Sequence, residues 1–329
     1  NDSFLYRNHG ISSYSSTLNA HTHHVLGDLG FSTRNIRRID MLGGTAITNY
    51  FFGLKYYDVL GRYGNHLTVR KRTSGLGFMA NRQIEDLKLK RGQAFDNLND
   101  FVQATAGNQR QYVYAPTTIS SAKFVHRDYF EYKVKFWANT TGPHYLYIPR
   151  VRLINVSFYI NGQKLSKLYS GLGTEMIPMG YMQKGQISTL TIHSTKELHH
   201  VAGDLGGIDL AKLRQVENYQ DNHKFKLQNP SLLNEHGAHF KGHVTVGKRA
   251  QTLVLTIPFD KGWQAKVDGH QRPIKKVAGG LVGVRVTPGK HQIAFNYHIR
   301  GLLAGALLTI VGLLGLTGTA IWRRLKSNM

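Results

Sequence analysis

The chain has 329 residues and no cysteine, and its 42 Lys and Arg outnumber its 19 Asp and Glu to give a formal net charge of +23. The lack of cysteine excludes disulfide bonds, thiolate metal sites and cysteine nucleophiles. The length suffices for two or three compact units, each with its own core. The strong positive charge predicts polyanionic neighbours, with general surface basicity as the alternative.

Residues 1–110 are predicted to form a mixed α/β segment. Short helices are expected over residues 22–29, 45–52 and 96–106, and a buried strand over residues 53–59. Gly75-Leu-Gly77-Phe-Met-Ala80 has the letters of a dinucleotide-binding fingerprint. Because no βαβ unit surrounds it, we interpret it as a glycine turn and expect no cofactor.

From residue 111 the hydrophobic period changes to two. Apolar and polar residues alternate over 130–136 and 156–161, and residues 186–193 form a similar run. Asn161-Gly162 between two extended segments predicts a type I′ hairpin turn, which needs positive φ at both positions. Short strands separated by turns predict a first β-sandwich, and residues 111–222 include it and a short following helix from Ile208 to Val216.

A second β-sandwich is predicted over residues 223–300. Its apolar positions alternate inward at Val244, Val246, Leu253, Leu255 and Ile257. Tight turns are expected at Asp268-Gly269 and Pro288-Gly289. The predicted fold is therefore mainly β, with two jelly-roll-like sandwiches, an N-terminal α/β segment and one C-terminal transmembrane helix.

The transmembrane helix is predicted over residues 301–321, a run without any charged residue. At about 1.5 Å per residue it covers the roughly 30 Å hydrocarbon core of a bilayer. The tail, residues 322–329, holds Trp322 and then Arg323, Arg324 and Lys326, which predicts that it is cytoplasmic and that residues 1–300 are extracytoplasmic. The alternatives are a buried helix of a soluble protein and a tail-anchored cytosolic domain.

The start of the chain bears on this topology. It begins at Asn1 without a Met, a basic n-region or an apolar h-region, although an extracytoplasmic domain must be exported. We therefore expect upstream spans in a larger multi-pass protein. Gly305 and Gly312 belong to a stripe of small residues that would allow close contact with those spans.

The block before the span resembles a known family. It contains the segments Ile257-Pro-Phe-Asp-Lys-Gly-Trp263, Val267-Asp-Gly269 and Pro288-Gly-Lys-His291, followed by Tyr297. This pattern is similar to that of the bacterial YfhO family. Looser likeness is found upstream in Phe4-Leu-Tyr-Arg7, Gly53-Leu-Lys-Tyr56 and Phe95-Asp-Asn-Leu98.

The resemblance implies a multi-spanning membrane protein of the glycosyltransferase-C type, a family linked in Gram-positive bacteria to lipoteichoic acid glycosylation. It implies a polyprenyl-phosphate sugar as donor and a teichoic acid-like polymer as acceptor. In that family the acid thought to act in sugar transfer lies in an early loop between spans, which this sequence lacks. No catalytic residue is therefore assigned.

Aromatic residues are the candidates for saccharide contact, because a sugar ring can lie flat on an exposed aromatic side chain. The candidates are Trp137, Tyr145, Tyr147 and Trp263. Core packing is the alternative for each of them. Asp260 and Asp268, which flank Trp263, are interpreted as turn residues rather than as the paired acids of a glycosidase.

Basic residues of the second sandwich are the candidates for contact with anionic lipid or polymer. They are Lys261, Lys266, Arg272, Lys275, Lys276, Arg285, Lys290 and Arg300. The candidate metal ligands are His21, His23, His24, His199 and His200. Because no acidic residue accompanies these histidines at a known spacing, no metal site is expected.

The leading prediction is an accessory region and final span of a membrane glycosyltransferase-like protein. Its expected partners are the bilayer, upstream helices of the same protein, a polyprenyl-phosphate sugar and a teichoic acid-like polymer, but not nucleic acid, which a domain outside the cell would rarely meet. The main alternative is a non-enzymatic, membrane-anchored module that binds saccharide or anionic polymer. A secreted hydrolase is the third possibility.

Overall fold

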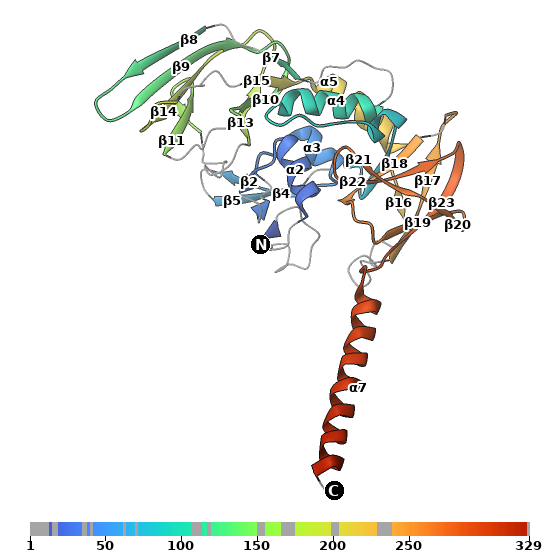
Figure 1. Cartoon of the computed structure of the whole chain (residues 1–329). Coiled ribbons are helices and arrows are strands. Elements are labelled where there is room, and N and C mark those ends of the chain that lie inside the picture. The colour runs from blue at the N-terminus through green and yellow to red at the C-terminus, as the bar shows by residue number, and fades with distance from the viewer. Residues whose placement is uncertain are drawn as a thin grey trace.

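A body of packed sheets and short helices leads into one long C-terminal helix (Figure 1). The computed structural model describes residues 13–14, 19–34, 38–39, 42–61, 64–69, 72–106, 114–116, 120–149, 155–165, 175–198, 204–228, 239–249 and 251–327. The prediction of a mainly β chain with an N-terminal α/β segment and an apolar C-terminal helix is confirmed.

The first sandwich packs a five-stranded sheet on a four-stranded sheet. The five-stranded sheet contains β8 (Ser120–Val125), β9 (Phe130–Trp137), β11 (Val156–Ile160), β12 (Gln163–Lys164) and β14 (Ile187–Ser194). The four-stranded sheet contains β7 (Tyr114–Pro116), β10 (Gly142–Tyr147), β13 (Met176–Met182) and β15 (Asp204–Ile208). Phe136, Phe158 and Leu190 meet Leu146 and Met179 in the core between them. Alternation along β9 and β14 places every second residue in this core.

The second sandwich also has a five-stranded and a four-stranded sheet. The first of these contains β16 (Lys226–Leu227), β17 (His239–Val246), β19 (Trp263–Val267), β20 (His270–Arg272) and β23 (Gly289–Tyr297). The other contains β6 (Gly77–Ala80), β18 (Gln251–Pro258), β21 (Ile274–Val277) and β22 (Leu281–Val286). Leu253, Val284, Ile293 and Phe295 are fully or almost fully buried between the two sheets.

The strand β6 comes from the N-terminal segment but forms the edge of the second sandwich. It pairs antiparallel with β18, with Met79 opposite Leu253. Gly77 is needed at this edge, because a Cβ atom there would lie 2.7 Å from the carbonyl oxygen of Val254. The N-terminal segment and the second sandwich therefore share a sheet.

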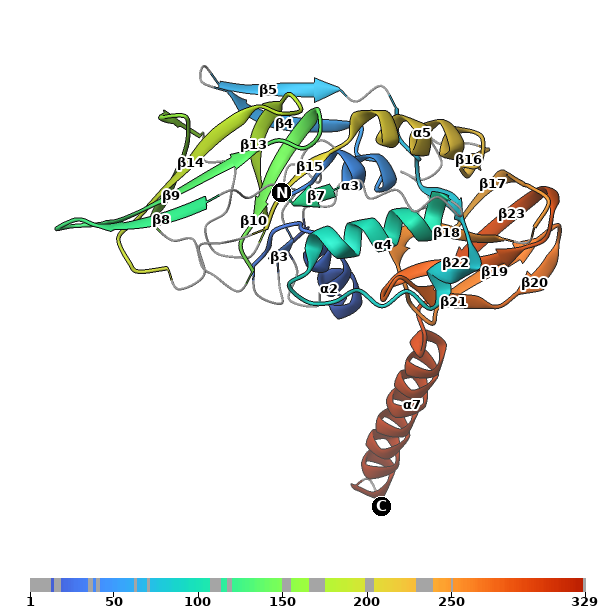
Figure 2. The same ribbon diagram turned by 90° about the horizontal axis from the view of Figure 1, so that it is seen from above.

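The remaining helices of the body contribute residues to a central core, and five short strands lie in the N-terminal segment beside them in the sequence. The helices are α2 (Ala20–Asp28), α3 (Ala46–Phe51), the 3₁₀ turn η2 (Arg82–Glu85), α4 (Ala94–Ala106) and α5 (Leu210–Asp221). The strands are β1 (Ser13–Tyr14), β2 (Thr33–Arg34), β3 (Arg38–Ile39), β4 (Tyr56–Gly61) and β5 (Gly64–Val69). The strand expected over 53–59 begins at Tyr56, because residues 52–53 form a turn. Figure 2 shows α3 and α4 between the two sandwiches.

Two of the predicted tight turns have the expected backbone. Asn161 and Gly162 have φ of 48° and 81°, and Asp268 and Gly269 have φ of 50° and 84°. These left-handed values are what a two-residue type I′ turn requires. The turns fix the registers of the hairpins β11–β12 and β19–β20.

The C-terminal helix α7 (Leu302–Ser327) has 26 residues and extends past the predicted span into the basic tail. It is the one helix in the described part of the chain that is long and apolar enough to cross a membrane. None of its residues is buried against the body. Its exposed surface fits a lipid environment or contact with other helices.

Candidate functional site

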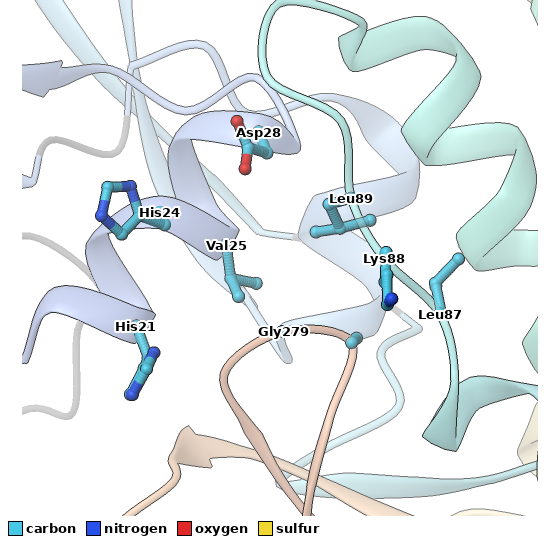
Figure 3. A pocket seen from close by; sticks show the side chains of 9 residues that line it. His21, His24, Val25, Asp28, Leu87, Lys88, Leu89 and Gly279 are labelled. Atoms are coloured by element: carbon cyan, nitrogen blue, oxygen red, sulfur yellow. The ribbon is translucent and has the colours of Figure 1, made fainter.

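A pocket lies where α2 meets the second sandwich, with a cavity volume of about 280 Å³ (Figure 3). Its walls come from α2, from the loop after η2 and from the turn between β21 and β22. The lining residues are His21, His24, Val25, Asp28, Leu87, Lys88, Leu89, Ala278 and Gly279. Three segments that are far apart in the sequence therefore meet at this point.

Local backbone features hold these walls together. Asn19 caps α2 by accepting hydrogen bonds from the backbone N–H groups of His21 and Thr22, and its side chain donates to the carbonyl oxygen of Phe259. Gly280 allows the turn to approach the first turn of α2, because a Cβ atom there would lie 2.8 Å from the carbonyl oxygen of His21. The N–H of Ala278 donates to the carbonyl oxygen of Ile84 at 3.2 Å.

The carboxyl group of Asp28 is the unusual ionisable group of the pocket. Burial raises its pKa, and the nearby His24 and Arg91 partly oppose this change. On the side of the first sandwich, burial together with the charges of Asp28 and Asp204 raises the pKa of Tyr147 to about 12. Burial and the charge of Asp96 also raise the pKa of Asp204. Acidic groups therefore gather where the pocket approaches the first sandwich.

The pocket combines hydrogen-bonding groups with an apolar wall. Asp28 can accept a hydrogen bond from a hydroxyl group, and His24 and Lys88 can donate to hydroxyl or phosphate oxygens, while Val25 and Leu89 offer apolar contact. Its volume lies just below the roughly 300–1,000 Å³ that is common for small-molecule sites. Such a site suits one small hydroxylated group rather than a whole polymer.

The histidines that are candidate metal ligands lie on α2 or outside the described residues. His21 and His23 are part of a helix, so the extended geometry that would place both rings on one side is not present. His199 and His200 lie outside the described residues. Among the residues that the structure describes, no three His, Asp or Glu side chains are grouped so that they could hold a metal ion.

The aromatic candidates for saccharide contact are in different environments. Tyr145 and Tyr147 are only 6% and 2% exposed in the central core, so their assignment as saccharide contacts was wrong. Alternation alone could not show this burial, because it results from packing against the N-terminal helices. Trp263 is half-buried against Phe240 and Tyr297. Trp137 is 44% exposed and stays a candidate.

Two of the basic candidates already have a protein partner. Lys275 and Arg285 bind Glu85 of η2, with nitrogen to oxygen distances of 2.6 Å each. The Glu85 carboxylate also accepts a hydrogen bond from Thr252 and is 5% exposed. One carboxylate therefore offsets one of the two positive charges, and Lys275 and Arg285, which are 40% and 49% exposed, stay candidates for contact with an anionic polymer or lipid.

Other lysines share one surface of the second sandwich. Lys266 and Lys290 point outward from β19 and β23, and the strand registers place Lys226 and Lys241 on the same side. We call Lys226, Lys241, Lys266 and Lys290 the basic face. All four are exposed, and none forms an ion pair within the described part of the chain. Lys226 and Lys241 were missed because the pairing of β16 with β17, and of β17 with β23, was not recognised.

The other four basic candidates lie at the margins of this sandwich. Arg272 and Lys276 are exposed on the edge strands β20 and β21. Lys261 and Arg300 lie near the start of α7, because the N–H of His298 donates to the carbonyl oxygen of Gly262 at 3.0 Å. The eight candidates therefore do not form one patch.

The chain is similar to bacterial membrane proteins. A family model described as bacterial membrane protein YfhO matches residues 1–309. An uncharacterized protein YfhO from Bacillus subtilis (strain 168) is 25% identical over 167 residues, which are 49% of this chain and 18% of the relative.

Solved structures of the arabinofuranosyltransferase AftD from Mycobacteria were also found. A mutant form is 15% identical, with a TM-score of 0.22 over 54% of this chain and 15% of that one. Another AftD structure is 17% identical, with a TM-score of 0.21 over 56% of this chain and 14% of that one. The family match over residues 1–309 confirms the resemblance found in the sequence, and the chain belongs to the YfhO family of bacterial membrane proteins.

Proposed function

We propose that this chain is the extracytoplasmic accessory region and last span of a membrane glycosyltransferase-like protein. It would assist transfer of a sugar from a polyprenyl-phosphate donor to a cell-envelope polymer such as lipoteichoic acid. The YfhO family match and the candidate span α7 support the membrane setting. The catalytic residues would lie in a part of the parent protein other than this chain.

The observation that carries this proposal is the basic face on the sheet whose strand β23 leads into α7. β23 ends at Tyr297 and α7 begins at Leu302, and Lys241 and Lys266 lie opposite Ala294, three residues before the end of β23. Exposed lysines without an ion-pair partner attract a phosphate polymer through several weak contacts that depend on salt. The basic face would thereby keep the acceptor polymer near the membrane-embedded catalytic part.

A triple substitution tests this role in the full-length membrane protein. Lys241→Gln, Lys266→Gln and Lys290→Gln together should raise the KM for the polymer acceptor by roughly tenfold, because three weak charge contacts are removed. The kcat should stay unchanged, since these residues do not touch the reacting atoms. The measurement is transfer of a labelled sugar from the polyprenyl-phosphate donor in membranes, at low and at high salt.

The matched control removes the same charge elsewhere. Lys184, Lys196 and Arg214 are exposed and lie outside the basic face, so their replacement by glutamine should leave the KM nearly unchanged. An equal effect of both triple variants would show that only general basicity matters. Loss of polymer binding without any effect on transfer would favour a non-enzymatic surface module.

The proposed topology has a separate test. A reporter fused after Met329 should be active in the cytoplasm, because Arg323, Arg324 and Lys326 follow the span. Protease added to intact protoplasts should digest residues 1–300. Protection of that region from protease would contradict the extracytoplasmic assignment.

A further inference from the structure

The solvent-facing side of the five-stranded sheet in the first sandwich has an unusual set of side chains. Residues of β9, β11 and β14 that alternate with the buried core residues point to this side. We call this surface the aromatic face. It consists of Glu131, Lys133, Lys135, Trp137, Ser157, Tyr159, Ile187, Thr189, Thr191 and His193.

Four rings form a continuous strip at one end of the aromatic face. His126 and Tyr129, from the turn before β9, stack with their centroids 4.3 Å apart. Tyr129 lies 4.9 Å from His193 of β14, and His193 lies 4.7 Å from Tyr159 of β11. The ammonium group of Lys164 lies 5.9 Å from the centroid of the Tyr159 ring. The strip therefore crosses neighbouring strands of the sheet.

The strip is held in place before any ligand arrives. The Nε2 atom of His193 and the ammonium of Lys133 each lie 3.0 Å from an oxygen of Glu131. These contacts fix the His193 ring between its two tyrosine neighbours. Because the side chains are already ordered, a ligand that binds them loses less conformational entropy. His193 is nevertheless 32% exposed, so the strip is accessible.

The opposite end of the aromatic face presents another ring. Trp137 is 44% exposed at the end of β9 and lies opposite Ile187, which is 59% exposed. Trp137 is roughly 20 Å along the strand from the row that contains Glu131. The residues between the two ends are polar or basic, with Lys135 opposite Thr189 and Lys133 opposite Thr191.

The charge of the aromatic face indicates the kind of ligand. Its one carboxylate, Glu131, already binds Lys133 and His193. Lys135 and, at the margin, Lys164 form no ion pair with any residue that the structure describes. Ring contacts between neighbouring strands also stabilise a sheet, and this role accounts for the presence of Tyr159 and His193. It does not account for the exposed Trp137 or for the positive charges of Lys135 and Lys164. Rings at both ends and free positive charge between them suit an elongated anionic sugar chain.

We propose that the aromatic face binds an acidic polysaccharide laid along β9 and β14, with sugar rings on the strip at one end and on Trp137 at the other. This site lies on a different sandwich from the basic face and does not depend on the glycosyltransferase role. Its partner is defined by chemistry, as a polymer of sugar units that bear anionic groups.

The test is direct binding by the chain of residues 1–329 in detergent micelles. Polygalacturonate is the acidic probe, dextran the neutral probe, and trigalacturonate an acidic probe too short to join both ends. Wild-type protein should bind polygalacturonate more tightly than dextran or trigalacturonate. Trp137→Ala and Tyr159→Ala should each weaken polygalacturonate binding by about tenfold, because each removes one ring contact.

Two further variants distinguish the contributions of ring stacking and of charge to binding from an effect on folding. Tyr159→Phe keeps the ring and should keep the affinity, whereas Lys135→Gln should reduce the preference for polygalacturonate over dextran. Tyr181→Ala is the matched control, since Tyr181 is 57% exposed on β13 of the opposite sheet. Thermal unfolding of each variant checks that the sandwich is intact.

Three results would overturn the proposal. One is unchanged polygalacturonate affinity in both Trp137→Ala and Tyr159→Ala. Another is an equal loss in Tyr181→Ala, which would show that binding is not confined to the aromatic face. The third is equal affinity for dextran and polygalacturonate, which would remove the acidic requirement. Sugar transfer is not measured, so failure here is distinct from failure of the proposed glycosyltransferase role.

Discussion

Replacement of Glu85 by glutamine is expected to lower the free energy of unfolding by about 2–3 kcal/mol at neutral pH. Glu85 joins η2 to the second sandwich, because it binds Lys275 of β21, Arg285 of β22 and Thr252 of β18. The hydrogen bonds from Arg285, and then those from Lys275 and Thr252, lower the pKa of Glu85 to about 2 against the opposing effect of burial. A neutral amide cannot replace these charge-assisted bonds.

The effect should depend on pH in a defined direction. The carboxylate of Glu85 has a folded-state pKa of about 2 against an ordinary value of 4.5. Its contribution to stability is therefore fully present above pH 4.5 and is lost as the pH falls toward 2. The difference between wild type and Glu85→Gln should consequently shrink as the pH is lowered from 7 to 3.

Urea unfolding of the chain in detergent micelles at pH 7 and pH 3 measures both effects. Glu197→Gln is the matched control, since Glu197 pairs with Lys123 on the surface and both side chains are at least 40% exposed. An exposed pair of this kind contributes about 1 kcal/mol or less. If Glu85→Gln were no more destabilising than Glu197→Gln, Glu85 would not stabilise the junction.

Replacement of Phe51 by alanine is expected to cost about 3–5 kcal/mol of stability, as for other buried Phe to Ala changes. Phe51 ends α3 and is fully buried. Its ring centroid lies 4.8 Å from that of Phe78 in β6 and 5.4 Å from that of Phe101 in α4. The substitution removes contacts with both rings and leaves a cavity at the centre of the body.

The urea midpoint of Phe51→Ala should fall well below that of wild type. Phe124→Ala is the control, because Phe124 is 45% exposed on β8 and its loss leaves no closed cavity. Since β6 belongs to the second sandwich, the change should also reduce amide-exchange protection along β18. Retained protection along β18 would mean that the central core and this sheet are not coupled.

Much of the fold could be predicted from local pattern. The alternating residues 130–136 form most of β9, as predicted. The Asn161-Gly162 and Asp268-Gly269 turns have the positive φ values that their residue types allow. The apolar run after residue 301 became α7. Each of these features depends on residues that are close in sequence, so the sequence pattern is sufficient to identify them.

Features that join distant segments could not be predicted in this way. Glu85 pairs with Arg285 across 200 positions, and β6 joins β18 through a register that no local period indicates. The local sequence pattern around Tyr145 does not distinguish a buried from an exposed aromatic side chain. In the structure Tyr145 lies in the central core, where its hydroxyl accepts a hydrogen bond from the N–H of Ala46. The ring strip was missed because His193 and Tyr159 become neighbours only when β14 pairs with β11.

The short connection between β23 and α7 limits how far the body can move away from α7. Residues 298–301 separate the two elements and can extend at most about 14 Å. Once α7 is in a bilayer, the body diffuses with it in two dimensions, within a thin layer above the headgroups. Encounters with lipid-linked molecules are then governed by their density in the membrane plane, which gives a high effective concentration even when they are rare in the cell.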